Sequence, residues 1–423
     1  MIDISEEEKN NYKSDIGNKQ IRLEFYRYDT DISPTYVLEN ENIISESMEL
    51  NEALSTESNI RYGQCFSNRF SIDIFNLKQT LGSDIDFIGY KLKAFIYTNN
   101  NIRLYPRMGI YPGMGTSNNI YPNMPLYKLD EIPLFVGYIT DSKLSDNRNN
   151  RKITAYDILN KKLNTDITEL FWNDLIKGKT AKYIREKILS YLDIPYENVS
   201  LSNDNLEFLD AYFKDNTNFK INARQALESI LEICGCFGHI NRYGIFTFKT
   251  LIQTYYNYPA LSTDERVKYP TSNLYLGNQR EAIEMFSEEF KTYINCRYGE
   301  SKTKSITGIS FIKNNNYIVD AIYPNTENVY ISKGNCYLEY FMEGETFSSY
   351  ISSNLYQQIS NIIYTPVSLQ CVGLPYLEVG DYVLVYINND DAKFLTFPIL
   401  SRHLKGIQSL KDTLEAKGNK YRK

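Results

Sequence analysis

Hydrophobic and polar residues alternate with a period of two in several short segments of the first third of the chain. Four segments have the length and composition of strands: Arg69–Ile74, Lys91–Ile96, Ile132–Thr140 and Arg151–Ala155. In the first of them, Phe70, Ile72 and Ile74 occupy every second position. Alternation of this kind is typical of strands that bury one face. We therefore predict a polar N-terminal arm at residues 1–20 and a β-rich domain at residues 21–155.

A long segment inside this domain breaks the pattern. Residues 100–128 contain the unit Tyr-Pro-x-Met three times, which excludes a helix and a central strand because proline lacks the backbone donor that both need. A loop stiffened by proline loses little entropy on docking, and methionine adapts to irregular surfaces. The alternative is a loop that packs only on its own domain. We predict that it contacts a neighbouring subunit or partner through Tyr105, Met108, Tyr111, Met114, Tyr121 and Met124.

In the middle of the chain, the spacing of the apolar residues becomes that of a helix. In Ala181–Leu192, isoleucine and leucine recur every four positions and form one apolar face. A second helix is predicted to begin after Asn222, whose side chain can cap the first turn, and to end at Gly235. Two short strands around a turn at residues 241–244 follow. These features predict a mixed α+β domain at residues 156–252.

The last third of the chain returns to strand-like segments. A helix is expected to end before Pro366, because the residue before proline avoids the helical region. Leu377–Ile387 predicts a strand, a Gly-Asp turn and a second strand, and Phe394–Leu400 predicts the final strand. The predicted parts are a connector at residues 253–280, a second β-rich domain at residues 281–412 with one helix, and a polar tail at residues 413–423. The predicted fold class is α+β and mostly β.

Composition and charge limit the classes of protein to which this chain can belong. The chain has 423 residues, including 37 Tyr and 21 Phe, and a net charge of −6. Tyrosine suits strands and interfaces, whereas a negative chain lacks the basic surface of a protein that reads nucleic acid. No apolar run reaches the ~20 residues that cross a bilayer, so no membrane span is predicted. The acidic, polar N-terminus is not a secretory signal, and we expect the chain to fold in a cytoplasm.

Few residues could carry chemistry. The chain has two histidines and no Gly-x-Ser-x-Gly, phosphate-loop or His-Glu-x-x-His motif. Cys234, Cys236 and His239 are close enough in sequence to hold zinc or to form a Cys–His nucleophile pair. A structural zinc site needs a fourth ligand, however, and Cys234 falls on the apolar face of a predicted helix. The loop methionines could bind Cu(I) but lack supporting His or Cys. We predict structural packing for Cys234, Cys236 and His239, contacts for the loop methionines, and no metal, cofactor or catalytic residue.

Several stretches together resemble a known family. They are Ser47–Cys65, Phe135–Ile167, Ala226–Phe248, Gly373–Tyr386 and Ile399–Asp412. Taken in this order, they look like the tail hub or tail-associated proteins (baseplate hubs) of bacteriophages and prophages of Gram-positive bacteria and of phage-tail-like particles. The resemblance spans nearly the whole chain and rests on the order of the stretches, since no single motif is highly specific.

The resemblance implies an architecture and a set of partners. Such a hub is a homotrimer at the distal end of the tail tube, in which each chain supplies two tube-like β-barrel domains and a mixed α+β domain between them. The implied partners are tail-tube or distal tail ring proteins, a tip, spike or fibre protein, and the C-terminus of the tape measure. The implied location is the tail tip (baseplate) of the virion, with roles in host cell attachment and DNA ejection. Relatives often continue into a peptidoglycan-cleaving domain, which we expect a partner to supply here.

Two alternatives remain from the sequence. The first is a tail-tip cell-wall hydrolase that acts through Cys234, Cys236 or His239, which predicts cleavage activity lost on alanine substitution. The second is a receptor-binding adhesin of the same tail, which predicts direct binding of the isolated protein to host envelopes. A structural hub predicts binding to tail-tube or distal tail rings instead.

Overall fold

The structure is a computed structural model that describes most of the chain. It covers residues 2, 4, 6–13, 19–57, 60–75, 85–98, 131–146, 148–174, 178–208, 220–251, 284–287, 292–313, 316–318, 328–337, 353–360, 362–387 and 393–418. The loop at residues 100–128, with all six of its candidate contact residues, and the connector at residues 253–280 lie outside this set. The role predicted for that loop therefore stays a prediction.

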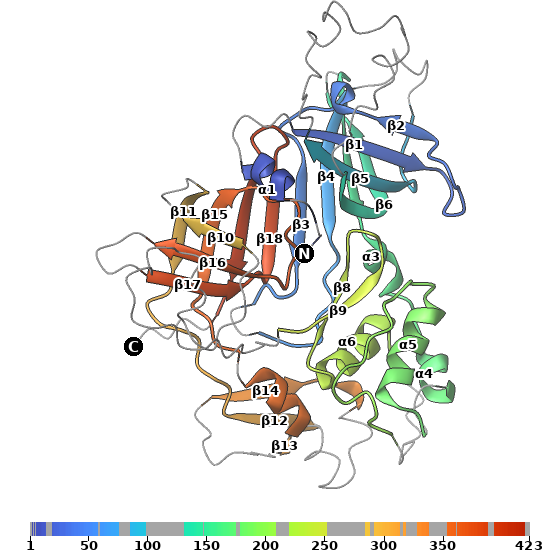
Figure 1. Cartoon of the computed structure of the whole chain (residues 1–423). Helices are drawn as coiled ribbons and strands as arrows, with labels where there is room; N and C mark the ends of the chain where they lie inside the picture. Colours follow the sequence, from blue (N-terminus) through green and yellow to red (C-terminus); the bar gives the residue numbers. More distant parts are fainter. Residues whose placement is uncertain are drawn as a thin grey trace, which may run out of the picture.

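Two groups of strands, one from each end of the chain, build one large sheet. The first group is β1 (Lys19–Tyr26), β2 (Tyr36–Leu38), β3 (Glu49–Ala53), β4 (Arg69–Phe75), β5 (Lys91–Thr98), β6 (Ile132–Leu144) and β7 (Asn150–Tyr156). The second group is β11 (Tyr293–Tyr298), β15 (Val367–Val372), β18 (Ser401–Lys405) and β19 (Lys411–Ala416). The eleven strands follow the order β11-β15-β19-β18-β3-β4-β7-β6-β5-β1-β2 (Figure 1). The groups meet where β3 and β18 pair antiparallel, with Glu52 opposite Arg402.

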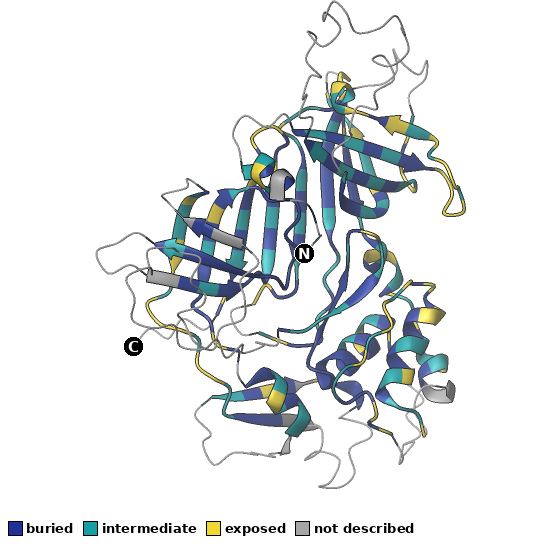
Figure 2. Ribbon diagram, viewed as in Figure 1, coloured by how far each residue is buried: buried dark blue, intermediate teal, exposed yellow. Residues whose placement is uncertain are grey.

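The alternating residues of this sheet form the core that the sequence predicted. Dark and light bands alternate along its strands in Figure 2. The alternating apolar side chains of β4 and β5 are fully buried: Phe70, Ile72, Ile74, Leu92, Ala94 and Ile96. Burying such side chains stabilises the fold by roughly 1.5–3 kcal/mol each for the larger ones. A mostly β fold with few helices is thus confirmed. The sheet ends at β11 and β2, and within the described ranges no strand pairing closes it.

The middle of the chain forms a group of helices and a hairpin. Its elements are α3 (Ile158–Lys162), α4 (Thr168–Asp174), α5 (Ala181–Tyr191), α6 (Ala223–Ile233), β8 (Phe237–Ile240) and β9 (Phe246–Lys249). Asn222 caps α6 as predicted, because its side chain accepts a hydrogen bond from the Gln225 backbone N–H at 2.8 Å. Gly235 and Gly244 adopt φ of +65° and +81° after α6 and in the hairpin turn. The helix and hairpin predictions are confirmed. No helix in the described part of the chain is long and apolar enough to span a membrane.

Two three-stranded sheets complete the described strands. One contains β10 (Glu284–Ser287), β16 (Tyr382–Ile387) and β17 (Lys393–Pro398), and the other contains β12 (Gly308–Lys313), β13 (Asn316–Ile318) and β14 (Val329–Lys333). The β12–β14 sheet is fastened to α6 by Glu232. That buried carboxylate accepts hydrogen bonds from the Tyr330 hydroxyl at 2.7 Å, the Ser332 hydroxyl at 2.9 Å and the Asn335 amide at 2.8 Å.

The remaining helical segments are short. They include α1 (Glu6–Lys13), the 3-10 turn η1 (Asn40–Asn42) and a helix at residues 353–359. The last of these confirms the helix predicted before Pro366. The stretch predicted as a polar arm contains α1, whose Tyr12 is buried and donates a hydrogen bond to the carbonyl of Ile96 in β5 at 3.4 Å.

Two predictions for the end of the chain are wrong. Phe394–Leu400 is not the final strand, because β18 and β19 follow it. These strands carry Arg402 and Asp412 at core-facing positions, so their alternation is masked when only apolar residues are counted. The strand predicted at the start of Leu377–Ile387 is also absent. The Asp381 carboxylate accepts a hydrogen bond from the Glu378 backbone N–H at 2.9 Å and holds that segment as a turn.

Candidate functional site: a buried charge cluster

The predicted Cys–His group is buried in the core. Cys234, Cys236 and His239 have no exposed surface. Burial raises the pKa of the Cys234 thiol to about 12, and that of Cys236 well above its usual value. Metal binding and nucleophilic attack both require the thiolate, which this environment disfavours. Among the described residues, no group of three or more His, Cys, Asp or Glu side chains is arranged to hold a metal ion.

The structure instead brings together four charged residues that are far apart in sequence. Glu52 lies on β3, Arg402 on β18 and Asp412 on β19, while Arg242 lies in the turn between β8 and β9. All four are at least 97% buried, which is exceptional for charged side chains. We call these four residues the junction cluster. It lies where the two β-rich regions and the middle domain meet.

The geometry of the junction cluster pairs its charges. Arg402 Nε donates to Asp412 Oδ2 at 2.7 Å, and Arg402 Nη1 lies 3.6 Å from Glu52 Oε2. Arg242 Nη2 lies 3.3 Å from the same Glu52 oxygen. One glutamate on β3 therefore contacts an arginine from the C-terminal strands and an arginine from the middle domain. Two arginines face two carboxylates, so the formal charges balance.

A turn before β16 completes the surroundings of the junction cluster. Both arginines donate to the backbone carbonyl of Leu377, and Arg402 Nη2 also donates to the carbonyl of Leu374 at 2.7 Å. Nearby, Lys249 Nζ lies 3.4 Å from Glu378 Oε2. Burial alone would raise the pKa of Glu378, but the charges of Lys249 and Arg242 outweigh it and hold that pKa at about 2.

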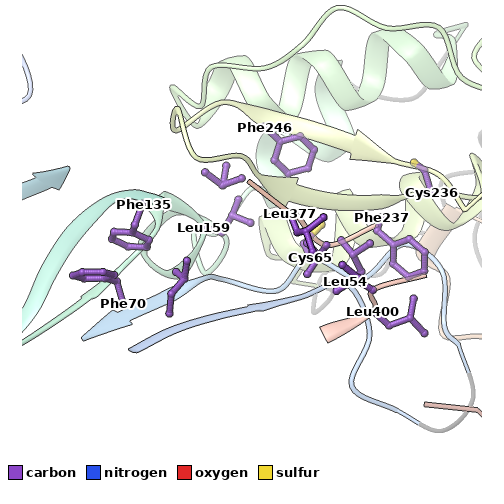
Figure 3. Packing of buried hydrophobic residues seen from close by; sticks show 14 of the residues in the cluster. Leu54, Cys65, Phe70, Phe135, Leu159, Cys236, Phe237, Phe246, Leu377 and Leu400 are labelled. Atoms are coloured by element: carbon purple, nitrogen blue, oxygen red, sulfur yellow. The ribbon is translucent and has the colours of Figure 1, made fainter. Parts of the chain in front are cut away.

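Buried apolar side chains surround these charges. Figure 3 shows Leu54, Leu377 and Leu400 among the buried residues of this region. The backbone N–H of Leu54, just after β3, donates to the carbonyl of Leu400, just before β18, at 2.7 Å. In such surroundings each charge depends on its partner, because removing either one leaves a buried charge without compensation. The arrangement suits a structural joint that fixes three parts of the chain relative to one another.

The junction cluster was not predicted from the sequence, although a signal was present. Glu52 follows Met48 and Leu50 with a spacing of two, and Leu54 continues the same series. Arg402 likewise falls between Leu400 and Leu404 in the alternating pattern. A charged residue at a core-facing position of an alternating strand indicates a buried ion pair, because such a charge is not left unpaired.

His239 lies beside the junction cluster, and it provides a test of the burial there. Neither ring nitrogen has a hydrogen-bond partner among the described residues, and burial lowers the pKa of His239 to about 4. The folded state thus binds fewer protons than the unfolded state between pH 6.5 and 4, so stability falls as the pH falls through this window. The loss attributable to this residue is about 3 kcal/mol at the acidic end of the window.

We expect His239→Leu to flatten this pH dependence. Leucine is similar in volume and carries no polar atom, so the variant should also be more stable by about 1 kcal/mol at neutral pH. The measurement is urea denaturation of variant and parent between pH 7 and pH 4. Asp157, whose pKa burial raises to about 7, contributes equally to both proteins and cancels in the difference. Parallel curves for the two proteins would contradict the prediction.

The chain matches no protein-family model, and no curated protein sequence matches it. Several solved structures resemble it over nearly the whole of both chains. The 43 kDa tail protein of prophage MuSo2 from Shewanella oneidensis is 8% identical with a TM-score of 0.48, and the match covers 94% of this chain and 96% of that one. A tail protein from Neisseria meningitidis MC58 is 9% identical with a TM-score of 0.48, over 95% and 97% of the two chains. The prophage tail protein gp18 from Listeria monocytogenes EGD-e is 13% identical with a TM-score of 0.40, over 95% of each chain. At TM-scores below 0.5, these likenesses do not by themselves assign a function.

Proposed function

We propose that this chain is a structural hub protein at the distal end of a phage or phage-like tail. Three copies form a ring that joins the tail tube to the tip or spike, and the protein catalyses no reaction. Its partners are tail-tube or distal tail ring proteins on one side and a tip, spike or fibre protein on the other. The proposal assigns one tube-like domain to residues 21–155 and a second to residues 281–412.

The observation that carries this proposal is the joint between the two β-rich regions. Strands from both regions share one eleven-stranded sheet, and the junction cluster fixes β3 against β18 at the point where they meet. A threefold ring with six tube-like positions requires each chain to supply two β units in a fixed mutual orientation. A buried joint with paired charges supports that requirement, whereas two flexibly linked β domains would not.

The alternatives receive less support from the described residues. A hydrolase acting through Cys234, Cys236 or His239 would need these groups to reach a polymer, and they have no exposed surface. An adhesin would bind host envelopes, whereas a hub would bind tail-tube or distal tail rings. The order of the resembling stretches, from Ser47–Cys65 to Ile399–Asp412, favours the hub.

The loop at residues 100–128 has a role within the same proposal. A proline-stiffened segment with four tyrosines and three methionines suits a contact that is made repeatedly in an assembly. We propose that it clasps an adjacent hub subunit, or the next ring or tip protein, through Tyr105, Met108, Tyr111, Met114, Tyr121 and Met124.

The proposal predicts self-assembly into threefold rings. At high concentration, the purified chain should sediment with three times its monomer mass, and negative-stain images should show threefold rings. The purified protein should also cosediment with tail tubes or distal tail rings and not with host envelopes.

A chain lacking residues 100–128 should assemble more weakly, and unchanged assembly would mean that the loop packs only on its own domain. A monomer that binds envelopes or cleaves peptidoglycan would refute the hub.

A further inference from the structure

The turn between β1 and β2 presents an unusual apolar side chain. Ile32 is 100% exposed, and Tyr28 in the same turn is 60% exposed. Isolated exposed apolar residues are common, but a fully exposed isoleucine at the tip of a hairpin gains nothing within its own chain. Figure 2 shows this turn as an exposed projection beyond the sheet, on the right of the view. We call residues 27–35 the hairpin tip.

Two aspartates precede Ile32 in the same turn and are held in place. Asp29 Oδ1 accepts a hydrogen bond from the Tyr138 hydroxyl at 2.8 Å. Asp31 Oδ2 accepts one from the Tyr28 backbone N–H at 3.0 Å. These bonds preorganise the tip, so that docking it would cost little conformational entropy. With Arg27 as its one cation, the hairpin tip carries a net negative charge.

A hollow of about 290 Å³ lies at the other end of the molecule, beside β14. We call it the β14 groove. Segments distant in sequence line it, and its floor includes three buried apolar or aromatic residues: Tyr62, Ile359 and Tyr364. Among the described residues, the charged lining residues are Arg61, Lys304 and Glu57, and these three carry a net positive charge. The Glu57 carboxylate accepts a hydrogen bond from the Gln64 amide at 3.2 Å.

We propose that the hairpin tip of one copy of this chain inserts into the β14 groove of a second copy. The tip supplies a projecting apolar side chain with acidic neighbours, and the groove supplies a hollow with buried apolar side chains in its floor and two cations, Arg61 and Lys304, in its described lining. In Figure 1 the β1–β2 hairpin and the β12–β14 sheet lie at opposite ends of the folded molecule, so one copy cannot make this contact with itself. The contact is head-to-tail, and head-to-tail contacts close into rings when the rotation permits.

The inference deepens the proposed function, on which it rests, because it names the surfaces through which copies meet. A single hairpin tip is smaller than the roughly 1,000 Å² that a stable interface needs, so it acts as an anchor within a wider contact. Anchors of this kind, buried in a pocket at the centre of an interface, often dominate its affinity.

Ile32→Asp in the full chain tests the contact without a risk to folding, since the side chain is fully exposed. We expect its self-association, measured by sedimentation, to be at least tenfold weaker than that of the parent. Tyr191→Asp, at an exposed site at the end of α5, is the matched control and should associate like the parent. Association of Ile32→Asp equal to that of the parent would overturn this contact and leave the proposed ring intact.

A mixing experiment tests the head-to-tail geometry. The Arg61→Glu/Lys304→Glu chain has an altered groove and an intact tip, whereas Ile32→Asp has the reverse. Each alone should associate weakly, and an equimolar mixture should form one-to-one pairs that cannot extend or close. A mixture as weak as its components would overturn the pairing of these two surfaces. A parent chain that stays monomeric at every concentration would count against the proposed function itself, and with it against this contact.

Discussion

Arg402→Met is expected to lower the free energy of unfolding by about 3–5 kcal/mol, the loss typical of breaking a buried ion pair by removing one partner. Methionine fills much of the space of the arginine stem but leaves Asp412 and Glu52 buried with fewer compensating charges. Asp412 loses its close contacts with Arg402 Nε and Nη2, at 2.7 and 2.6 Å. The carbonyls of Leu374 and Leu377 lose donors as well. Urea denaturation at neutral pH measures the loss.

A matched control lies three residues further along the same strand. Lys405 on β18 faces Glu49 on β3 with an Nζ–Oε1 distance of 3.1 Å, and its side chain is 56% exposed. Lys405→Met therefore removes an ion pair between the same two strands at a solvated position, and we expect a loss below about 1 kcal/mol. Equal losses for the two variants would show that burial adds nothing to the Arg402 pairs, and would remove the basis for the structural joint.

The sequence predicted the parts of this fold that depend on local periodicity. The alternation at Phe70, Ile72 and Ile74 and the cap at Asn222 are local signals, and both elements lie where they were expected. The joint between β3 and β18 was not predicted, because pairing between strands some 350 residues apart leaves no periodic trace in either strand. The only traces were chemical: an acidic residue occupied the position of Glu52 in one apolar series, and a basic residue occupied that of Arg402 in another.

The attachment of the β12–β14 sheet was hidden for a similar reason. Its strands lie between β11 and β15 in sequence, both of which belong to the large sheet, so proximity along the chain suggested a continuation of that sheet. Glu232 on α6 determines where it is attached, yet within its helix it looks like an ordinary solvent-facing glutamate. Helical spacing alone does not reveal that the donors come from residues 330–335, about 100 positions away.

Glu232→Leu is therefore expected to release the β12–β14 sheet from α6, with a loss of about 3–5 kcal/mol, because several buried donors lose one acceptor. Leucine keeps the helix propensity of the position. The Tyr330 and Ser332 hydroxyls and the Asn335 amide would lose their carboxylate acceptor in an apolar site. The loss should be local, since α6 keeps its other contacts and the large sheet is unaffected. Hydrogen exchange measured by mass spectrometry should show faster exchange across residues 328–337 and unchanged exchange in β3 and β18.

Two further variants make this expectation specific to the carboxylate. Tyr330→Phe removes one donor to Glu232, and with it the hydroxyl that accepts from the Tyr62 backbone N–H at 3.2 Å. It keeps the ring, whose centroid lies 5.7 Å from that of Tyr62, so a smaller loss of about 1–2 kcal/mol is expected at the same peptides. Glu186→Leu on α5 removes a half-buried glutamate paired with Lys182 one turn away and should change stability by about 0.5 kcal/mol at most. If Glu232→Leu accelerated exchange evenly through the whole chain, the β12–β14 sheet would be an inseparable part of one cooperative unit. Unchanged exchange at residues 328–337 would show that apolar packing, and not Glu232, holds that sheet in place.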